Sequence, residues 1–288
     1  MTPEQPGAIL RSTEWLSHAL SDPNVRILDG SFHLPGSGRD ARAEFERAHI
    51  PGAAFFDIDA ICDRETTLPH MLPTAAAFER AMEGLGISND DLVVVYDAPG
   101  SMGAARVWWT FRAFGHRTVS LLNGGLSKWC AEEKETESQV RSMPLGRYMA
   151  RHQADLVCSI EQLRETLVTG QAQIVDNRPA RRFLGLDPEP RPAHRRGHIP
   201  GSVNIPFDGF IRPAEHNTWK QETELRSVFR TSGIDLNRPI VASCGSGVTA
   251  ALTAFAACLL GHENVSVYDG SWAEWGNRDD TPVQESPS

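Results

Sequence analysis

The chain has 288 residues, of which 40% are hydrophobic and 23% are charged, and its formal net charge is −9 at pH 7. This composition is typical of a globular protein of about two domains, and the acidic balance argues against nucleic-acid binding as its main function. No apolar run is long enough to cross a membrane and no secretory signal opens the chain, so we expect no membrane partner.

The cysteines favour a reducing compartment. They are odd in number, widely spaced and without a Cys-x-x-Cys pair: Cys62, Cys130, Cys158, Cys244 and Cys258. Free thiols are usual in the cytoplasm, whereas secreted chains use paired cysteines. We therefore predict a cytoplasmic protein.

The chain contains a long internal repeat. Four blocks recur in the same order, namely 26–29 with 173–176, 49–53 with 198–202, 93–97 with 240–244, and 120–129 with 266–275. Asp29 precedes Asp97 by 68 positions, and Asp176 precedes Cys244 by the same number. A period this long indicates a duplicated domain rather than a solenoid. We predict domains at 1–138 and 156–288, joined by a linker at 139–155 that lacks sustained periodicity.

In chain order, the second half alternates helical and strand patterns. A helix over 159–169 begins at Ser159 and ends before Gly170, and strands follow at 173–175 and 203–205. A helix near 221–231 precedes a strand at 240–242, a small-residue helix at 248–260 and a last strand at 265–268. Such alternation predicts an α/β fold, in which each domain is a parallel sheet with helices on both faces.

Cys244 stands where this fold binds ligands. The segment Cys244-Gly-Ser-Gly-Val-Thr-Ala250 joins a predicted buried strand to a predicted helix. The carboxyl ends of parallel strands and the first amides of a helix favour anions, including a thiolate. Gly245 and Gly247 permit unusual backbone angles and close approach of a substrate. The alternative is that Cys244 is a small buried residue, which is the reading we give Cys258.

This loop resembles the active-site loop of the rhodanese superfamily, in the form found in its mercaptopyruvate sulfurtransferases. The two His-Ile-Pro-Gly turns, Tyr268-Asp-Gly-Ser-Trp-Ala-Glu-Trp275, Pro69-His-Met-Leu-Pro73 and Ala105-Arg-Val-Trp-Trp109 are similar as well. The resemblance implies two tandem rhodanese-like domains, a small-molecule sulfur donor and a persulfide on Cys244. The repeat pairs Cys244 with Asp97, which cannot carry a persulfide, so we expect the first domain to be non-catalytic.

Arginines near the middle of the second half suggest an anion site. Six of them lie within nineteen positions: Arg178, Arg181, Arg182, Arg191, Arg195 and Arg196. By resemblance, Arg182 and Arg191 bind the donor's carboxylate and carbonyl, since guanidinium groups suit such oxygens; the other four are read as structural. The residues after the cysteine are uncharged, which favours 3-mercaptopyruvate over the dianion thiosulfate as donor. The resemblance also assigns substrate contacts to Gly245, Gly247, Val248 and Thr249.

The resemblance also implies a route for proton transfer. Relatives have been assigned a relay that falls on Ser246, His70 and Asp59 of this chain. Since His70 and Asp59 belong to the first half, the relay requires a site between the domains. The expected acceptor is a thiol such as thioredoxin, or cyanide, and no cofactor or metal is expected. His194 and His198 lack a ligand set, and the repeated His49 and His198 are read as structural.

Three other functions are alternatives to this interpretation. Thiosulfate sulfurtransferase is the runner-up within the same class of enzyme. A cysteine phosphatase needs arginine six positions after the cysteine, and that position is Ala250. A non-catalytic sulfur-binding module is disfavoured by Cys244 and its two glycines.

Overall fold

Each half of the chain forms a five-stranded parallel sheet, and both sheets have the same strand order. The computed structural model describes residues 7–141, 143–191 and 193–285. The first sheet runs β1-β5-β4-β2-β3, from β1 (Leu10–Arg11), β2 (Val25–Asp29), β3 (Ala54–Phe55), β4 (Leu92–Tyr96) and β5 (Val119–Leu122). The second runs β6-β12-β11-β7-β8, from β6 (Val157–Cys158), β7 (Gln173–Asp176), β8 (Val203–Asn204), β11 (Ile240–Ser243) and β12 (Val265–Tyr268). The predicted fold class and the duplication are confirmed.

Helices cover both faces of the first sheet, because its central strand is apolar on both sides. Val93 and Val95 of β4 pack with α3 (Ala75–Gly84) and α4 (Ala104–Ala113). Val94 and Tyr96, which point to the other face, pack with α1 (Thr13–Ala19), α2 (Ala41–Arg47) and α5 (Gly125–Ala131).

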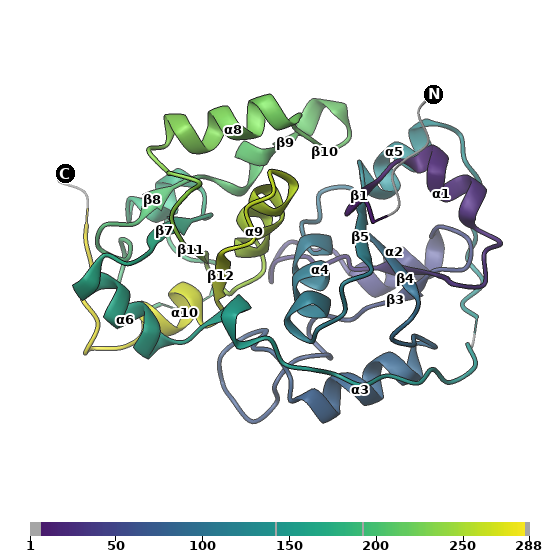
Figure 1. Ribbon diagram of the computed structural model, residues 1–288, viewed down its shortest axis with the longest axis horizontal. Coiled ribbons are helices and arrows are strands. Elements are labelled where there is room, and N and C mark those ends of the chain that lie inside the picture. Colours follow the sequence, from purple (N-terminus) through teal and green to yellow (C-terminus); the bar gives the residue numbers. More distant parts are fainter. Residues whose placement is uncertain (1–6, 142, 192, 286–288) are drawn as a thin grey trace.

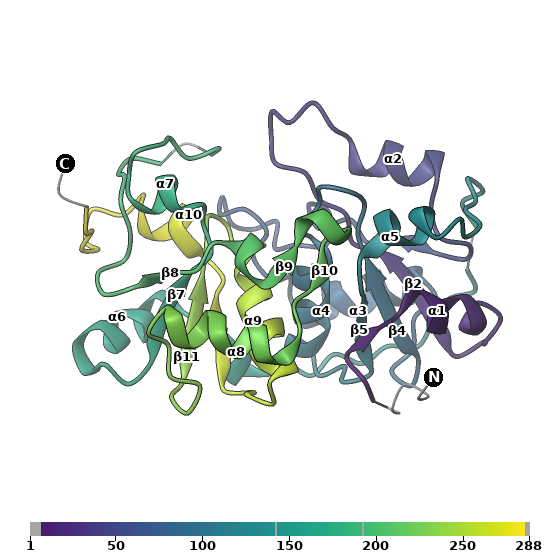
Figure 2. The ribbon, with the colours of Figure 1, turned by 90° about the horizontal axis from the view of Figure 1, so that it is seen from above.

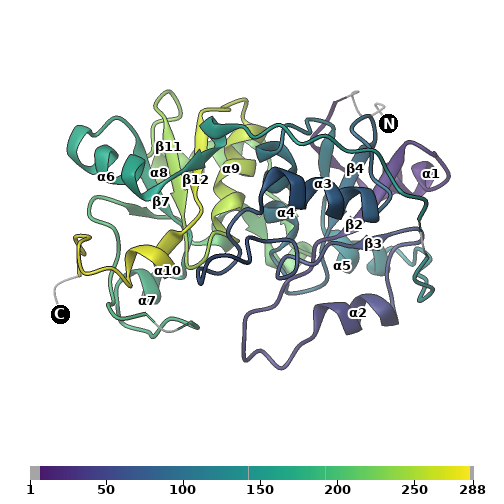
Figure 3. The same cartoon turned by 90° about the horizontal axis from the view of Figure 1, so that it is seen from below.

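The second sheet is covered in the same way. Ile240 and Ala242 of β11 face α8 (Glu222–Thr231) and α9 (Ala250–Leu259), whereas Val241 faces α6 (Ile160–Thr169) and α10 (Ser271–Trp275). The short α7 (Ala180–Phe183) lies near α10, on the side away from α8 (Figures 2 and 3).

The two halves lie side by side and share one hydrophobic core (Figure 1). Helices α4 and α9, the counterparts in the repeat, pack against each other at the centre of the molecule. Trp108 of α4 meets Phe255 of α9 edge to face, with 4.9 Å between ring centroids. The carboxyl ends of β4 and β11 are thereby brought to the same region between the halves.

Two segments bridge the halves. The antiparallel hairpin of β9 (Ile211–Arg212) and β10 (Thr218–Trp219) belongs to the second half, yet the Trp219 amide donates to Asn123 Oδ1 of the first at 2.9 Å. This hairpin was not predicted.

The connector between the halves lies against the surface of the first half. The Gly146 amide donates to the Glu83 carbonyl and the Arg151 amide donates to the Phe114 carbonyl, both at 2.9 Å. A single-turn 3-10 helix, η1 (Ala154–Leu156), ends it.

Two predicted helices test the local reasoning. Helix α6 is confirmed, since Ser159 caps its first turn and Gly170 ends it with φ +65°. The prediction that a helix begins at Val248 was wrong, because α9 begins at Ala250. Gly247 has φ +78°, and Val248 and Thr249 form a turn before the helix. The loop between Cys244 and α9 is consequently two residues longer than expected.

Candidate active site

Cys244 follows the central strand β11 and is 2% exposed. Its backbone is fixed by α10, since its amide donates to Ser271 Oγ at 3.1 Å and its carbonyl accepts from the Trp272 amide at 3.0 Å. The Ser271 hydroxyl also lies 4.0 Å from the Cys244 sulfur, as a donor. The carbonyl of Gly245 is bonded in turn to the Ala273 amide at 2.9 Å.

The backbone amides that follow Cys244 are available to bind a ligand. Within the described residues, no protein acceptor is bonded to the backbone amides of 245–249. These amides follow Cys244 directly in the chain and precede α9, whose dipole also favours negative charge at its amino end. This arrangement suits a thiolate or a persulfide anion, and it would stabilise charge that develops during attack on a donor.

Behind the loop lies a buried ion pair between the two halves. Arg106 of α4 donates to Asp269 Oδ1 at 2.5 Å and to the Gly247 carbonyl at 3.1 Å, and it also bonds the His70 carbonyl. Asp269 Oδ2 accepts from the Leu72 amide at 2.7 Å. One guanidinium thus connects the loop that carries Cys244 with the segment that carries His70.

The same ion pair explains the glycine at 247. A Cβ added there would lie 2.7 Å from the Asp269 carbonyl oxygen and 3.0 Å from Arg106 Nη1. Gly247 therefore faces away from the cavities that Gly245 and Ser246 line. Close approach to the ion pair thus accounts for the glycine at this position, and a contact between the Gly247 backbone and the substrate stays a prediction.

Asp59, His70 and Ser246 are brought into one region, but Arg191 lies between the last two. His70 Nδ1 is 3.2 Å from Asp59 Oδ1, and His70 Nε2 is 2.8 Å from Arg191 Nη2. Arg191 Nη1 lies 3.5 Å from Ser246 Oγ. Burial lowers the pKa of His70 below its usual value, although Asp59 opposes this shift. His70 is therefore neutral at pH 7, with Nε2 as the acceptor towards Arg191.

The backbone at His70 is unusual. Its φ is +60°, a left-handed value that side chains other than glycine rarely adopt. The bond from Arg106 to the His70 carbonyl stabilises this turn, and Phe32 packs edge-on against the imidazole at 4.9 Å. Strained backbone of this kind often accompanies functional sites.

The predicted anion site is a small cavity beside the loop. Its lining includes Arg182, Glu189, Arg191, Gly245 and Ser246. Burial lowers the pKa of Arg191. Because the pKa of a guanidinium is ordinarily so high, Arg191 still carries its positive charge at pH 7. Both predicted arginines are thus brought to the side of the loop next to Cys244.

A larger cavity, of about 480 Å³, opens in front of Cys244. Val248 and Thr249 line it from the loop, Phe32 and Met102 from the first half, and Phe207 from the second. Because Cys244 itself opens into this space, a donor and a second molecule can both reach the sulfur from it.

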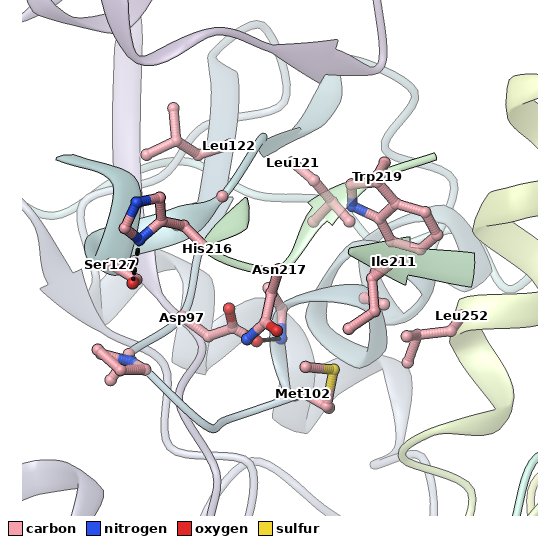
Figure 4. Close-up of a pocket in the computed structure, with 16 residues that line it drawn as sticks. Asp97, Met102, Leu121, Leu122, Ser127, Ile211, His216, Asn217, Trp219 and Leu252 are labelled. Carbon is pink, nitrogen blue, oxygen red and sulfur yellow. Dashed lines mark hydrogen bonds between the residues drawn. The ribbon is translucent and has the colours of Figure 1, made fainter. Parts of the chain in front are cut away.

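The first half contains a counterpart of the site, with Asp97 in the place of Cys244. The Asp97 carbonyl accepts from the Leu126 amide at 3.0 Å, as the Cys244 carbonyl does from Trp272. Figure 4 shows the pocket that Asp97, His216 and Trp219 line beneath the β9–β10 hairpin. Burial raises the pKa of Asp97 to about 7, against an opposing hydrogen bond from the Ala104 amide at 3.2 Å.

These two sites lie within domains that match a known family model. The model for a rhodanese-like domain matches residues 12–132 and again residues 159–278. The chain belongs to the rhodanese family.

Similar proteins extend over almost the whole chain. The 3-mercaptopyruvate sulfurtransferase of Homo sapiens is 44% identical and aligns with 92% of this chain and 91% of its own. The thiosulfate sulfurtransferase of Rattus norvegicus is also 44% identical, over 93% and 92% of the two chains. Among solved structures, SseA from Escherichia coli, described as a 3-mercaptopyruvate sulfotransferase, has a TM-score of 0.84 at 37% identity over 92% of this chain and 99% of its own.

Several residues of this rhodanese site were not found by sequence reasoning. Arg106 stands in a motif that was noted, Ala105-Arg-Val-Trp-Trp109, but it received no role; an arginine amid the apolar residues of a buried helix was the available signal. Asp269 and Ser271 directly follow β12, at the same sheet edge as Cys244. Glu189 carried no sequence signal.

The remaining predictions for the two rhodanese domains concern histidines, cysteines and the membrane. His49 and His198 have equivalent structural roles, with Nδ1 bonded to the carbonyls of Phe45 at 2.7 Å and Phe183 at 2.9 Å. All five cysteines are free. In the described parts of the chain, no helix is long and apolar enough to span a membrane, and no group of three or more potential metal ligands is found.

Proposed function

We propose that this chain is a sulfurtransferase that takes sulfur from 3-mercaptopyruvate and carries it as a persulfide on Cys244. The observation that supports this most directly is the buried cysteine at the end of β11, followed by a loop whose residues Gly245 and Ser246 share a cavity with Arg182 and Arg191. Family membership and relatives with this named activity support it further.

The first half-reaction transfers one sulfur atom. The Cys244 thiolate attacks the donor sulfur, the donor C–S bond breaks, and its electron pair leaves as the enolate of pyruvate, which must then gain a proton. Arg182 and Arg191 would bind the carboxylate and carbonyl of the donor, and the amides of 245–249 would stabilise the persulfide. In enzymes that use amides in this way, each hydrogen-bonding N–H group contributes about 3–4 kcal/mol to stabilisation of the transition state.

A proton relay through Ser246, His70 and Asp59 is part of the proposal, with a condition. Arg191 now donates to His70 Nε2 at 2.8 Å, so this nitrogen can take up the proton of the donor thiol and pass a proton through the Ser246 hydroxyl to the enolate only after Arg191 has moved. A donor carboxylate would attract Arg191 and so release the imidazole. Arg191 would then act in both binding and proton transfer.

In the second half-reaction, a thiol attacks the outer sulfur and regenerates the Cys244 thiolate, which splits one difficult transfer into two. The 480 Å³ cavity is large enough for an extended acceptor beside the persulfide. We propose that the acceptor is a thiol such as thioredoxin, or cyanide. We also propose a cytoplasmic location, which the five free cysteines favour, and domains at 1–138 and 156–288 with a linker at 139–155.

Thiosulfate is the second candidate donor, because a relative named for thiosulfate is as similar as the one named for mercaptopyruvate. The uncharged Gly245 and Ser246 disfavour a dianion next to the sulfur. Steady-state kinetics with each donor and one fixed acceptor would decide between them. We expect kcat/KM to favour 3-mercaptopyruvate by about tenfold or more, a difference of about 1.4 kcal/mol; a preference for thiosulfate would make the second candidate the better account.

A further inference from the structure

A carboxylate lies among the arginines of the donor site, where an anion is to be bound. Glu189 is 9% exposed and lines the same small cavity as Arg182, Arg191 and Gly245. Its Oε1 accepts from Arg178 Nη1 at 2.8 Å, and its Oε2 lies 3.5 Å from Arg182 Nη1. The negative charge is therefore inside the site rather than at its rim.

Arg178 does not need Glu189 as its counter-charge. Its Nε and Nη2 already donate to Asp176 Oδ2 at 3.0 and 2.7 Å, and Nη2 also donates to the Gly197 carbonyl at 2.9 Å. Arg178 thus has a buried counter-charge in Asp176 in addition to its bond with Glu189. The charge of Glu189 is thus available to offset Arg182 or Arg191.

The charge balance of the site follows from these contacts. Arg178, Arg182 and Arg191 contribute three positive charges, Asp176 and Glu189 contribute two negative ones, and the Cys244 thiolate contributes a third, so the site has no net charge before a donor binds. Asp59 lies on the far side of His70 and is 68% exposed, so solvent screens it. A singly charged donor would therefore add one negative charge to this site, whereas a doubly charged donor would add two and be repelled more strongly.

We propose that Glu189 is a specificity-determining residue that selects singly charged donors against doubly charged ones. The inference rests on the proposed function, because it assumes that the sulfur donor binds in this cavity. Glu189 Oε2 lies 3.7 Å from where a Cβ on Gly245 would be, so a dianion beside the loop would lie close to this carboxylate. Repulsion between like charges is strong at such distances when water is largely excluded.

The test compares Glu189→Gln with wild type, using 3-mercaptopyruvate and thiosulfate as donors and cyanide as the fixed acceptor. Glutamine keeps the size of the side chain and an oxygen for Arg178, but it removes the charge. We expect the ratio of kcat/KM for thiosulfate to kcat/KM for mercaptopyruvate to rise at least about tenfold, and to rise less at high salt. An equal change for both donors would overturn the proposal.

Asp187→Asn is the matched control. Asp187 lies two residues from Glu189 and pairs with Arg181 Nε at 2.9 Å, but its side chain is exposed and lines neither cavity. The same loss of charge there should leave the donor ratio within about twofold of wild type. Glu189→Asp, which keeps the charge, should keep the mercaptopyruvate preference; a shift as large as that of Glu189→Gln would assign the effect to shape instead.

A measurement on the unmodified protein covers the case in which Glu189→Gln does not fold. Pyruvate carries one negative charge and sulfate two, so we expect pyruvate to inhibit at lower concentration than sulfate. Stronger inhibition by sulfate would contradict the charge balance. Failure of the proposed function has a different signature, namely a wild-type preference for thiosulfate, and the change in donor ratio on Glu189→Gln can be read whichever donor wild type prefers.

Discussion

Cys244 and Asp97 occupy equivalent positions in two copies of one fold. They differ in chemistry because one side chain is a thiol and the other is a carboxyl group. Both follow a central buried strand, and both carbonyls accept an amide of the helix that follows the next strand. The side chain at Cys244 is a thiol before α9, whereas the side chain at Asp97 is a carboxyl group that accepts from the Ala104 amide at the start of α4. The first domain therefore retains the architecture of the site but lacks a sulfur nucleophile.

Asp97 makes stability depend on pH. Its folded pKa is about 7, whereas an aspartate in the unfolded chain has 3.8. Between pH 3.8 and pH 7 the folded protein keeps Asp97 protonated, whereas the unfolded chain has lost this proton. The free energy of unfolding therefore falls as pH rises towards 7, by up to about 4 kcal/mol in total from this group. Asp97→Asn should flatten the rise in unfolding free energy between pH 8 and pH 5, measured by urea denaturation. An unchanged slope would contradict the raised pKa.

At the scale of elements, the two glycines of the Cys244 loop differ in their surroundings. Only Gly247 lies against the Arg106–Asp269 ion pair. In Gly247→Ala, the new Cβ would lie 2.7 Å from the Asp269 carbonyl oxygen, and φ is +78°. The loop must move, so we expect kcat with mercaptopyruvate to fall about a hundredfold and stability to fall by about 1–3 kcal/mol.

Gly245→Ala provides the comparison. Its Cβ would lie 3.7 Å from the nearest atom, Glu189 Oε2, and its φ is not in the left-handed region. We expect no loss of stability in thermal unfolding and an effect mainly on KM, because this position lines the donor cavity. Equal losses of stability in the two variants would show that the ion pair does not constrain the loop.

Local signals predicted the elements of the second half, and contacts across the sequence decided the rest. Ser159 and Gly170 mark α6 because a cap and a left-handed end are local chemistry. The start of α9 could not be found in this way, because the turn before it is set by Arg106 and Asp269, which approach Gly247 from elsewhere in the fold.

The site divides along the same line. The resemblance pointed to Cys244, Arg182 and Arg191, which the structure brings together around one loop. Neither the contact between Arg191 and His70 nor the place of Glu189 could be predicted, because each depends on how distant segments pack. The β9–β10 hairpin was missed because its strands have two residues each and carry no periodic signal.

For the whole molecule, the central question is how two domains hold one site. Arg106 is 3% exposed and Asp269 is 2% exposed, and they join α4 of the first half to the segment after β12 of the second. Removing one member of such a buried pair typically costs about 3–5 kcal/mol, because the other charge is left unpaired.

Arg106→Met should therefore lower the unfolding free energy by about that amount and reduce kcat strongly, since the loop and the His70 turn both lose a contact. Arg112→Met is the control on the same helix, because Arg112 lies 3.8 Å from the exposed Glu263 and far from the loop contacts. It should change kcat by less than about twofold. If Arg106→Met kept wild-type kcat in a folded protein, the ion pair would have no part in positioning the site.

The most direct measurement is intact-protein and peptide mass spectrometry after incubation with 3-mercaptopyruvate in the absence of an acceptor. We predict that one sulfur atom is added to Cys244 for each pyruvate released, that a thiol acceptor removes it, and that Cys244→Ser folds normally but gains no sulfur and releases no pyruvate. Sulfur on another cysteine, or pyruvate release by Cys244→Ser, would contradict the account.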